Sequence, residues 1–494
     1  MSIISKTATE QCELMQRGQL SSVELTSAYL EQIKQRDPAI GAFVYLNEQQ
    51  ALADAHEVDN KRAAGQPLGT LAGLPVAVKD NLCCLDTPTT CASQILKNFV
   101  PPYDATVITR LKSADAVLIG RTNMDEFAMG SSTENSSVQA THNPWDLDCI
   151  PGGSSGGSAA CIAAEMAPLS IGSDTGGSIR QPAALCGIVG LKPSYGRVSR
   201  YGLIAFASSL DQIGPLTHTA QDAALLLQVL AGHDPHDSTS VNTPAADYVN
   251  SVTQPLQGLT LGVVEEHFQD GLNDEISSAV EAAIAVYESL GATIKKIEMP
   301  HARYGIATYY IIAPCEASSN LARFDGAHYG LRTTAEMENT SDEDPLNRMY
   351  RASRSAGFGE EVKRRIMLGT YALSEGYYDA FYLKALKVRR LIREDYDQAF
   401  QQVDLLIGPV TANPAFQQGE KTASPLAMYM EDLFTVTANL AGVAGISIPC
   451  GFTRTGLPIG LQLQSAAFQE ETLLRGAHMY QTATDWHLQR PDSV

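Results

Sequence analysis

The chain has 494 residues, of which 44% are hydrophobic and 18% charged, a composition typical of globular proteins with a large core. Its 35 basic and 55 acidic residues give a formal net charge of −20, so we do not expect it to hold a nucleic acid by neutralising phosphates; if a nucleic acid is involved, a partner should carry it. Nine scattered cysteines without a CxxC pair indicate free thiols in a reducing compartment, and since neither a signal peptide nor a bilayer-spanning apolar run is recognisable, we expect a cytoplasmic protein.

The first 150 residues predict helices followed by strands. Ser21 and Glu24 match a capping box, and apolar residues follow at helical spacing in SSVELTSAYLEQIKQRD. The stretch GLPVAVKDN (73–81) is a short apolar run that ends at a charge, so it predicts a buried strand. Residues 104–123 predict a helix and then a strand, and a long polar loop is expected over 124–151.

Two clusters of glycine and serine follow, PGGSSGGSAA (151–160) and GSDTGGSIR (172–180). Between and after them we predict a helix from Ser155 to Met166, a buried strand in APLSIGSD, a helix from Ser178 to Leu185 and a strand in GIVGLKP. Because this flanking sequence has the character of core, the clusters are not linkers. Glycine in such a place lets the backbone approach another group closely.

The second half of the chain continues the alternation of strands and helices. Residues 231–248 are the best candidate for a loop or linker, and about 302–400 predict a mostly helical stretch. Strands are predicted in LTLGVVE, ATIKKIEM, DLLIGPV, GISIPCGF and PIGLQLQS. Strands that alternate with helices predict an α/β fold.

Three familiar motifs resemble the clusters only in part. A phosphate loop needs a lysine that neither cluster has, and an aspartic protease needs a second DTG besides the one at Asp174. The segment GSSGG fits a nucleophile elbow centred on Ser155, but no strand precedes it, so this stays a weak alternative.

A lysine offers a fourth interpretation of the clusters. Lys79 ends the apolar stretch PVAVK, where a lysine is usually an ion-pair partner or extends its amine to solvent. A desolvated lysine can instead lose its proton and act as a base, which a serine nucleophile requires. Lys79 with one serine from each cluster would form a relay without histidine, and N–H groups near Ser178 would hold an oxyanion.

The motifs around these residues resemble those of the amidase signature family. That resemblance implies an α/β fold with a large central mixed β-sheet flanked by helices on both faces. It implies one domain over 1–494, with N-terminal helices at 1–65, a catalytic core at 66–220 and a mostly helical, substrate-side insertion at about 300–400. In the family, Lys79, Ser154 and Ser178 would form a Ser-cisSer-Lys triad, with a cis peptide bond before Ser154. Oxyanion donors would be the backbone N–H groups of Thr175, Gly176, Gly177 and Ser178.

From about Leu68 to the C-terminus, stretches such as EASSNLARFDG and EVKRRIMLGTYALS resemble the branch of the family that works in tRNA-dependent amidation. This implies a glutaminase whose ammonia converts Glu-tRNA(Gln) to Gln-tRNA(Gln). It implies a B subunit that uses ATP and Mg²⁺ and binds the tRNA, and a small C subunit, in a heterotrimer. No cofactor or metal is expected on this chain, and no membrane contact.

Glutamine is a zwitterion, so its pocket needs an anion and a cation. The resemblance implies that Asp432 takes the ammonium group and that Arg365 takes the carboxylate, for which a planar guanidinium is suited. Tyr309 is a further candidate, with Tyr310 as its alternative. From the residues alone, we would favour Asp432 as the start of a helix and Arg365 as a solvated charge. A free-standing amidase on another small amide, which would not need this pair, remains the alternative function.

Overall fold

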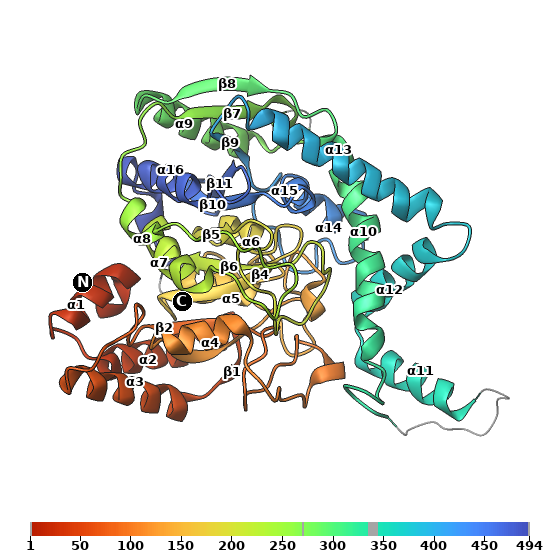
Figure 1. Cartoon of the computed structure of the whole chain (residues 1–494), viewed down its shortest axis with the longest axis horizontal. Coiled ribbons are helices and arrows are strands. Elements are labelled where there is room, and N and C mark those ends of the chain that lie inside the picture. The colour runs from red at the N-terminus through yellow and green to blue at the C-terminus, as the bar shows by residue number, and fades with distance from the viewer. Residues whose placement is uncertain (1, 269–270, 334–343, 493–494) are drawn as a thin grey trace.

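An 11-stranded mixed sheet organises the computed structural model, which describes residues 2–268, 271–333 and 344–492. The strand order is β1-β3-β2-β4-β6-β5-β10-β11-β9-β7-β8 (Figure 1). Parallel pairs join β2 to β3 and β4, and β7 to β8 and β9, while the remaining pairs are antiparallel. The strands are β1 (Phe43–Leu46), β2 (Pro75–Lys79), β3 (Val117–Thr122), β4 (Leu169–Asp174), β5 (Val189–Lys192), β6 (Gln212–Thr217), β7 (Thr260–Val264), β8 (Thr293–Ile297), β9 (Leu405–Pro409), β10 (Ala444–Phe452) and β11 (Pro458–Ser465).

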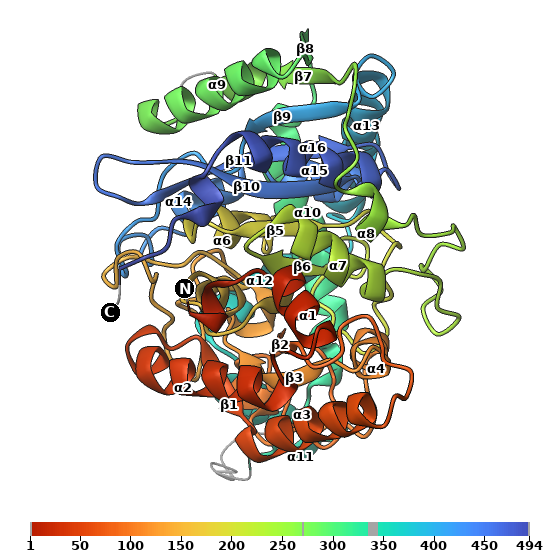
Figure 2. The ribbon, with the colours of Figure 1, turned by 90° about the vertical axis from the view of Figure 1, so that its left-hand side faces the viewer.

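Helices lie on both sides of this sheet, as predicted. In Figure 1, α7 and α16 are on one side of the central strands, and α6, α15 and α10 are on the other. Figure 2 shows α2 and α3 at the β1–β3 end and α9 at the opposite end. The helices are α1 (Ala8–Gln16), α2 (Ser22–Ile40), α3 (Glu48–Ala63), α4 (Thr106–Ser113), α5 (Gly156–Ala163), α6 (Arg180–Leu185), α7 (Ala220–Leu230), α8 (Tyr248–Ser251), α9 (Asp274–Ser289), α10 (Gly305–Asn320), α11 (Pro345–Gly357), α12 (Glu360–Leu373), α13 (Lys384–Ala399), α14 (Pro425–Tyr429), α15 (Val436–Ala441) and α16 (Glu470–Ala483).

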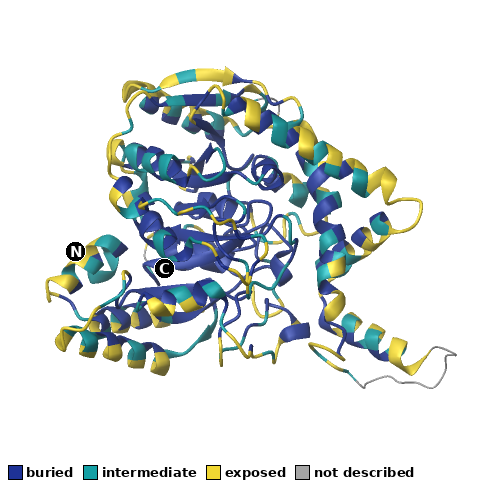
Figure 3. Ribbon diagram, viewed as in Figure 1, coloured by how far each residue is buried: buried dark blue, intermediate teal, exposed yellow. Residues whose placement is uncertain are grey.

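Local sequence signals account for many element boundaries. The Ser21–Glu24 capping box starts α2, and Gly41, at φ +69°, ends it in a left-handed conformation that glycine adopts without strain. All residues of β2, β4 and β5 are buried, as expected for strands covered on both faces. Figure 3 shows these central strands buried, whereas the outward faces of α11 to α13 are exposed.

Two predicted helices have different bounds in the structure, and two strands lie outside the predictions. The helix predicted over Ser155–Met166 is shorter, since α5 spans Gly156–Ala163, and the helix predicted from Ser178 begins at Arg180 in α6. Strands β1 and β6 were not predicted. β6 reads QIGPLT, and its glycine and proline weaken the strand signal, but antiparallel pairing with β4 and β5 fixes it between them.

Candidate active site

The amine of Lys79 lies in a cluster of serine hydroxyls. Lys79 is the last residue of β2, which pairs with β3 on one side and β4 on the other. Its Nζ lies 2.8 Å from the Oγ atoms of both Ser154 and Ser155, and 3.1 Å from the Oγ of Ser173. Complete burial lowers the pKa of Lys79 from 10.5 to about 7, although the nearby Asp125 carboxylate opposes this change. The amine can therefore serve as a base near neutral pH.

Ser154 lies in a loop that is held closely against its neighbours. The Gly153–Ser154 peptide bond is cis, as the resemblance predicts. The Ser154 carbonyl accepts the N–H of Asp125 at 3.3 Å, and the Asp125 carboxylate accepts the N–H groups of Thr133 at 2.9 Å and Asn135 at 3.2 Å. A Cβ added at Gly153 would lie 2.2 Å from that carboxylate. The glycine therefore permits close backbone packing, as expected for a cluster that is not a linker.

Ser178 lies in a turn that the carboxylate of Asp174 organises. Oδ1 of Asp174 accepts the N–H of Gly177 at 2.9 Å, and Oδ2 accepts the N–H of Ile179 at 3.2 Å, so α6 starts only after this turn. Ser178 is 8% exposed, and its hydroxyl makes no hydrogen bond with any residue that the structure describes. Its carbonyl accepts the N–H of Ser155 at 3.2 Å, which joins the two glycine–serine clusters.

The backbone N–H groups predicted to hold an oxyanion are not equally available. The N–H of Gly177 is already donated to Asp174, which departs from the prediction because the buried carboxylate takes it as a partner. The N–H groups of Gly176 and Ser178 make no hydrogen bond among the described residues. Thr175 holds the loop through its hydroxyl, which donates to Asp211 at 2.7 Å.

A buried ion pair that the sequence analysis missed fixes the same turn. Nε and Nη2 of Arg180 each lie 3.1 Å from an oxygen of Asp174. The guanidinium also donates to Gln462 and Asn439, both at 2.6 Å. Burial alone would raise the pKa of Asp174, but Arg180 outweighs it and lowers the pKa to about 2. The turn is therefore organised by a carboxylate that stays ionised at neutral pH.

Asp432 presents a buried carboxylate near this turn. Ser131 Oγ lies 3.0 Å from both of its oxygens, and the hydroxyl of Tyr310 donates to it at 2.9 Å. Burial raises the pKa of Asp432 to about 7, although these two hydrogen bonds favour the ionised form. Asp432 does not cap α15, whose N-cap residue is Thr435. The interpretation of Asp432 as a helix start is therefore wrong.

Arg365 belongs to α12, and its side chain lies among aromatic rings, one of which is the ring of Tyr310. Its guanidinium carbon is 5.3 Å from the ring centre of Tyr310, 5.4 Å from Tyr429 and 5.6 Å from Phe206. Its Nε donates to Glu361 at 2.7 Å, and neither Nη makes a hydrogen bond among the described residues. Arg365 is only 2% exposed, which excludes the alternative of a solvated charge. The two Nη groups could take a carboxylate.

The two tyrosines connect the charged groups to the turn of the second cluster. Tyr310 bonds to Asp432, while the ring of Tyr309 packs on Gly176, where an added Cβ would lie 2.7 Å from its hydroxyl. Thr435 Oγ1 donates to the carbonyls of both Gly176, at 2.6 Å, and Asp432, at 3.1 Å. Asp432 and the oxyanion turn are thus neighbours, and both tyrosines line their junction.

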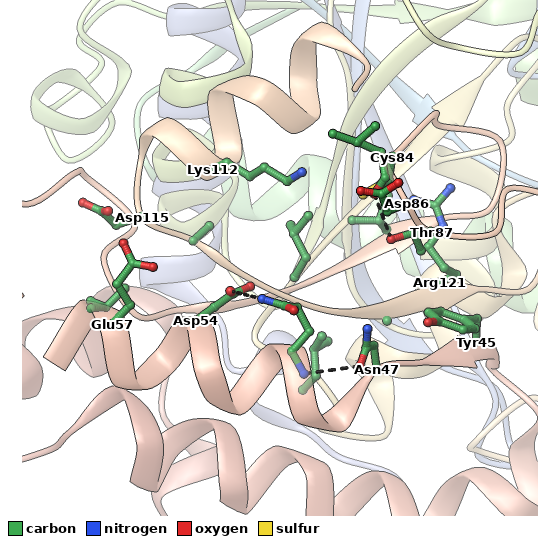
Figure 4. Close-up of a pocket in the computed structure, with 18 of the residues that line it drawn as sticks. Tyr45, Asn47, Asp54, Glu57, Cys84, Asp86, Thr87, Lys112, Asp115 and Arg121 are labelled. Atoms are coloured by element: carbon green, nitrogen blue, oxygen red, sulfur yellow. Dashed lines mark hydrogen bonds between the residues drawn. The ribbon is translucent and has the colours of Figure 1, made fainter. Parts of the chain in front are cut away.

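A cavity of about 480 Å³ lies at a different place, towards the β1 edge of the sheet. Figure 4 shows Asp54 and Glu57 from α3, Lys112 from α4 and Arg121 from β3 around it. No residue predicted to react or to bind substrate lines this cavity. We place the chemistry at the Lys79 cluster because a buried amine, several serine hydroxyls and free backbone N–H groups meet there.

All nine cysteines carry free thiols. Within residues 2–268, 271–333 and 344–492, no three His, Cys, Asp or Glu side chains are grouped to hold a metal ion. In the same ranges no helix has both the length and the apolar character needed to cross a membrane.

Comparisons with known proteins find a matching family model and relatives that are similar over nearly the whole chain. The model of the family described as Amidase matches residues 24–474. Proteins named as the A subunit of glutamyl-tRNA(Gln) amidotransferase are similar over nearly the whole chain. The one from Microcystis aeruginosa is 56% identical and the match covers 95% of this chain and 96% of that protein; the one from Rhodopirellula baltica is 56% identical with 98% of each covered.

Solved structures show the same fold. A crystal structure of the A subunit of glutamyl-tRNA(Gln) amidotransferase from Thermotoga maritima is 42% identical, with a TM-score of 0.79, and the match covers 96% of this chain and 94% of that one. The structure of 6-aminohexanoate cyclic dimer hydrolase is 25% identical, with a TM-score of 0.85 and 99% of each chain covered.

Proposed function

This chain belongs to the amidase family, and from that premise we propose that it is the glutaminase subunit of a glutamyl-tRNA(Gln) amidotransferase. One observation carries the proposal beyond a general amidase. Asp432 and Arg365, both buried, flank Tyr310 beside the turn of Ser178. A buried anion and a buried cation near one nucleophile suit a substrate that carries both an ammonium group and a carboxylate, as glutamine does.

We assign the nucleophile to Ser178, whose hydroxyl makes no hydrogen bond within the described part of the chain. In the first step, Ser178 Oγ attacks the carboxamide carbon of glutamine, and its proton passes to Ser154 while Ser154 gives its own proton to neutral Lys79. The 2.8 Å contact between Lys79 and Ser154 is already of hydrogen-bond length. The hydroxyls of Ser154 and Ser178 make no direct hydrogen bond with each other in the described structure. This contact, the second one that the relay needs, would form when substrate is bound.

The negative charge that develops on the carbonyl oxygen needs preorganised donors. The N–H groups of Gly176 and Ser178 are available for it, and the Asp174–Arg180 ion pair holds the turn that presents them. Donors that are fixed before the reaction cost no reorganisation when the charge appears. This is the physical reason for a buried ion pair at this position.

The tetrahedral intermediate then breaks its carbon–nitrogen bond. The departing nitrogen takes a proton from Ser154, which is reprotonated by the Lys79 ammonium group, and ammonia leaves. A glutamyl ester remains on Ser178. Water attacks that ester, its proton follows the same route to Lys79, and glutamate and the free Ser178 hydroxyl are produced. Every proton taken by Lys79 is returned, so the lysine ends the cycle neutral.

Glutamine would be oriented by its two charges. Its ammonium group would lie on Asp432 and would favour the ionised form of that carboxylate. Its carboxylate would take the two Nη groups of Arg365, which have no hydrogen-bond partner among the residues that the structure describes, while Glu361 and the surrounding rings hold the side chain in place. Tyr309 would close the pocket on the side of Gly176.

Ammonia would be used elsewhere in a larger complex. The relatives are named as subunits, and this supports a multi-subunit assembly. We expect its other members to be a B subunit that binds tRNA and uses ATP and Mg²⁺, and a small C subunit. The net charge of −20 supports the assignment of tRNA to the partner. We place the complex in the cytoplasm, as the free thiols of this chain suggest.

Ammonia release from glutamine tests the proposal. We would measure it for the full chain with and without co-expressed B and C subunits, and for a Ser178→Ala variant. Release that depends on Ser178 and increases with the partners is expected. If glutamine is untouched in every combination while a simple alkyl or aryl amide is cleaved through Ser178, the chain is a general amidase and the amidotransferase assignment fails.

A further inference from the structure

Gln181 joins the two halves of the candidate site through a single side-chain amide. It is the second residue of α6 and has no exposed surface. Its Oε1 accepts the N–H of Gly153 at 2.9 Å, and Gly153 directly precedes Ser154. Its Nε2 donates to the carbonyl of Ser131 at 2.9 Å. One amide thus bridges the loop of the relay serine and the loop of Ser131.

The loop of Ser131 contacts Asp432, the carboxylate that we propose binds the ammonium group. The hydroxyl of Ser131 lies 3.0 Å from both oxygens of Asp432, so the chain of contacts runs from Asp432 through Ser131 and Gln181 to Gly153. The bridge has little freedom, because a Cβ added at Gly152 would lie 2.5 Å from Gln181 Oε1. The four residues that make these contacts are all buried. The separation of Asp432 from Ser154 is therefore fixed by defined contacts.

We propose that Gln181 is a positioning residue that sets the distance between the ammonium site at Asp432 and the relay serine Ser154, and thereby makes the amidase specific for α-amino amides. The proposal rests on the proposed function, and it adds a specificity residue that does not touch the substrate. The amide of glutamine reaches Ser178 only through a flexible side chain, so the place where its ammonium group is held decides where the reacting carbon lies. A misplacement of about 1 Å can cost about 100-fold in rate.

A substrate without the α-ammonium group is not held in place by Asp432. Glutaramate, which is glutamine lacking that group, keeps the same carboxamide and carboxylate. Its hydrolysis still needs Lys79, Ser154 and Ser178, but not a defined distance to Asp432. The ratio of kcat/KM for glutamine to kcat/KM for glutaramate therefore measures the positioning effect, whereas a general loss of structure lowers both.

The experiment compares this ratio in the assembled complex for the native chain and for Gln181→Leu and Gln181→Glu. Gln181→Leu removes both hydrogen bonds of the bridge. Gln181→Glu keeps an acceptor for the Gly153 N–H and loses the donor to Ser131. We expect the native enzyme to prefer glutamine by about 30-fold or more, as for a buried charge pair. Both variants should reduce the preference by about tenfold, mostly through kcat for glutamine, and should retain most activity on glutaramate.

Gln481 on α16 offers a matched control. It also joins a backbone N–H to a backbone carbonyl, since its Oε1 accepts the N–H of Ala220 at 2.8 Å and its Nε2 lies 3.4 Å from the carbonyl of His218. Gln481→Leu removes the same kind of bridge from a different part of the fold, and it should leave the substrate ratio unchanged.

The outcomes separate this inference from the proposed function. If the native enzyme does not prefer glutamine over glutaramate, both the ammonium site at Asp432 and the positioning role are refuted. If the native enzyme prefers glutamine and the Gln181 variants keep the full preference, only the positioning role is refuted. Equal losses on both substrates, or a loss of fold in both variants, would mean that Gln181 is structural, and would also overturn the inference.

Discussion

The pH dependence of hydrolysis should follow the protonation state of Lys79. Burial lowers the pKa of this lysine from 10.5 to about 7, and the relay needs the neutral amine. The neutral fraction is about 10% one pH unit below the pKa and about 90% one unit above it. We therefore expect kcat/KM to rise roughly tenfold between about pH 6 and pH 8, with the midpoint near neutrality.

Glutamine alone cannot isolate this titration, because the pKa of Asp432 is also about 7 and the ionised carboxylate is needed to bind the ammonium group. Glutaramate avoids that second dependence. The assay is ammonia release from glutaramate below its KM, because kcat/KM then reports the ionisations of the free enzyme. With glutamine both groups must lose a proton, so the rise should be steeper than with glutaramate.

A matched variant makes the test specific. Lys79→Arg places a guanidinium that stays protonated throughout this range, so activity should be absent at every pH, not shifted to higher pH. The account of Lys79 as the base would be refuted by a flat profile for glutaramate, by a profile that falls from pH 6 to pH 8, or by an active Lys79→Arg enzyme.

Three further predictions concern the charged groups. Asp432→Asn should lower kcat/KM for glutamine by about 30-fold or more and change that for glutaramate by less than about threefold, as measured by ammonia release; similar losses on both would contradict an ammonium site. Arg180→Met leaves Asp174 as an unpaired buried charge, so urea denaturation should show about 3–5 kcal/mol lower stability, and an unchanged midpoint would contradict the role of this pair. The pKa of Lys79 is lower in the folded chain than in the unfolded chain, so the lysine costs stability at every pH below 10.5 and the cost shrinks as pH rises from about 7 to 10.5. Lys79→Met removes this pH-dependent cost, so urea denaturation should show the native chain gaining stability relative to the inactive variant as the pH rises from about 7 to 10.5; a stability difference that stays constant over this range would contradict the lowered pKa.

The sequence identified the elements whose signals are local. β2 is a short apolar run that ends at Lys79, and the capping box at the start of α2 is visible in the sequence as Ser21 and Glu24. The sequence does not predict β6, because QIGPLT forms a strand through its pairing with β4 and β5. These partners are distant in the sequence, so the residues of QIGPLT alone do not indicate the strand. Family motifs supplied Ser154, Ser178 and the cis bond, which no periodicity would reveal.

The contacts between distant segments needed the structure. Ser155 and Ser173 both approach Lys79, yet the position of Ser155 depends on how α5 packs against β2, and that of Ser173 on how β4 pairs with β2. The commitment of the Gly177 N–H to Asp174 follows from the direction of one peptide plane, which the letters DTGGS do not define. Arg365 looked like a surface charge in EEVKRR, and only the rings that surround it show otherwise.

The most direct test of the central claim is to locate the acyl-enzyme. The complex would be mixed with glutamine, quenched in acid within one turnover and digested, and the serine that carries a glutamyl ester would be identified by tandem mass spectrometry. The account predicts the ester on Ser178, and none in Lys79→Met. An ester on Ser154 or Ser155, or ammonia release without any ester, would contradict it.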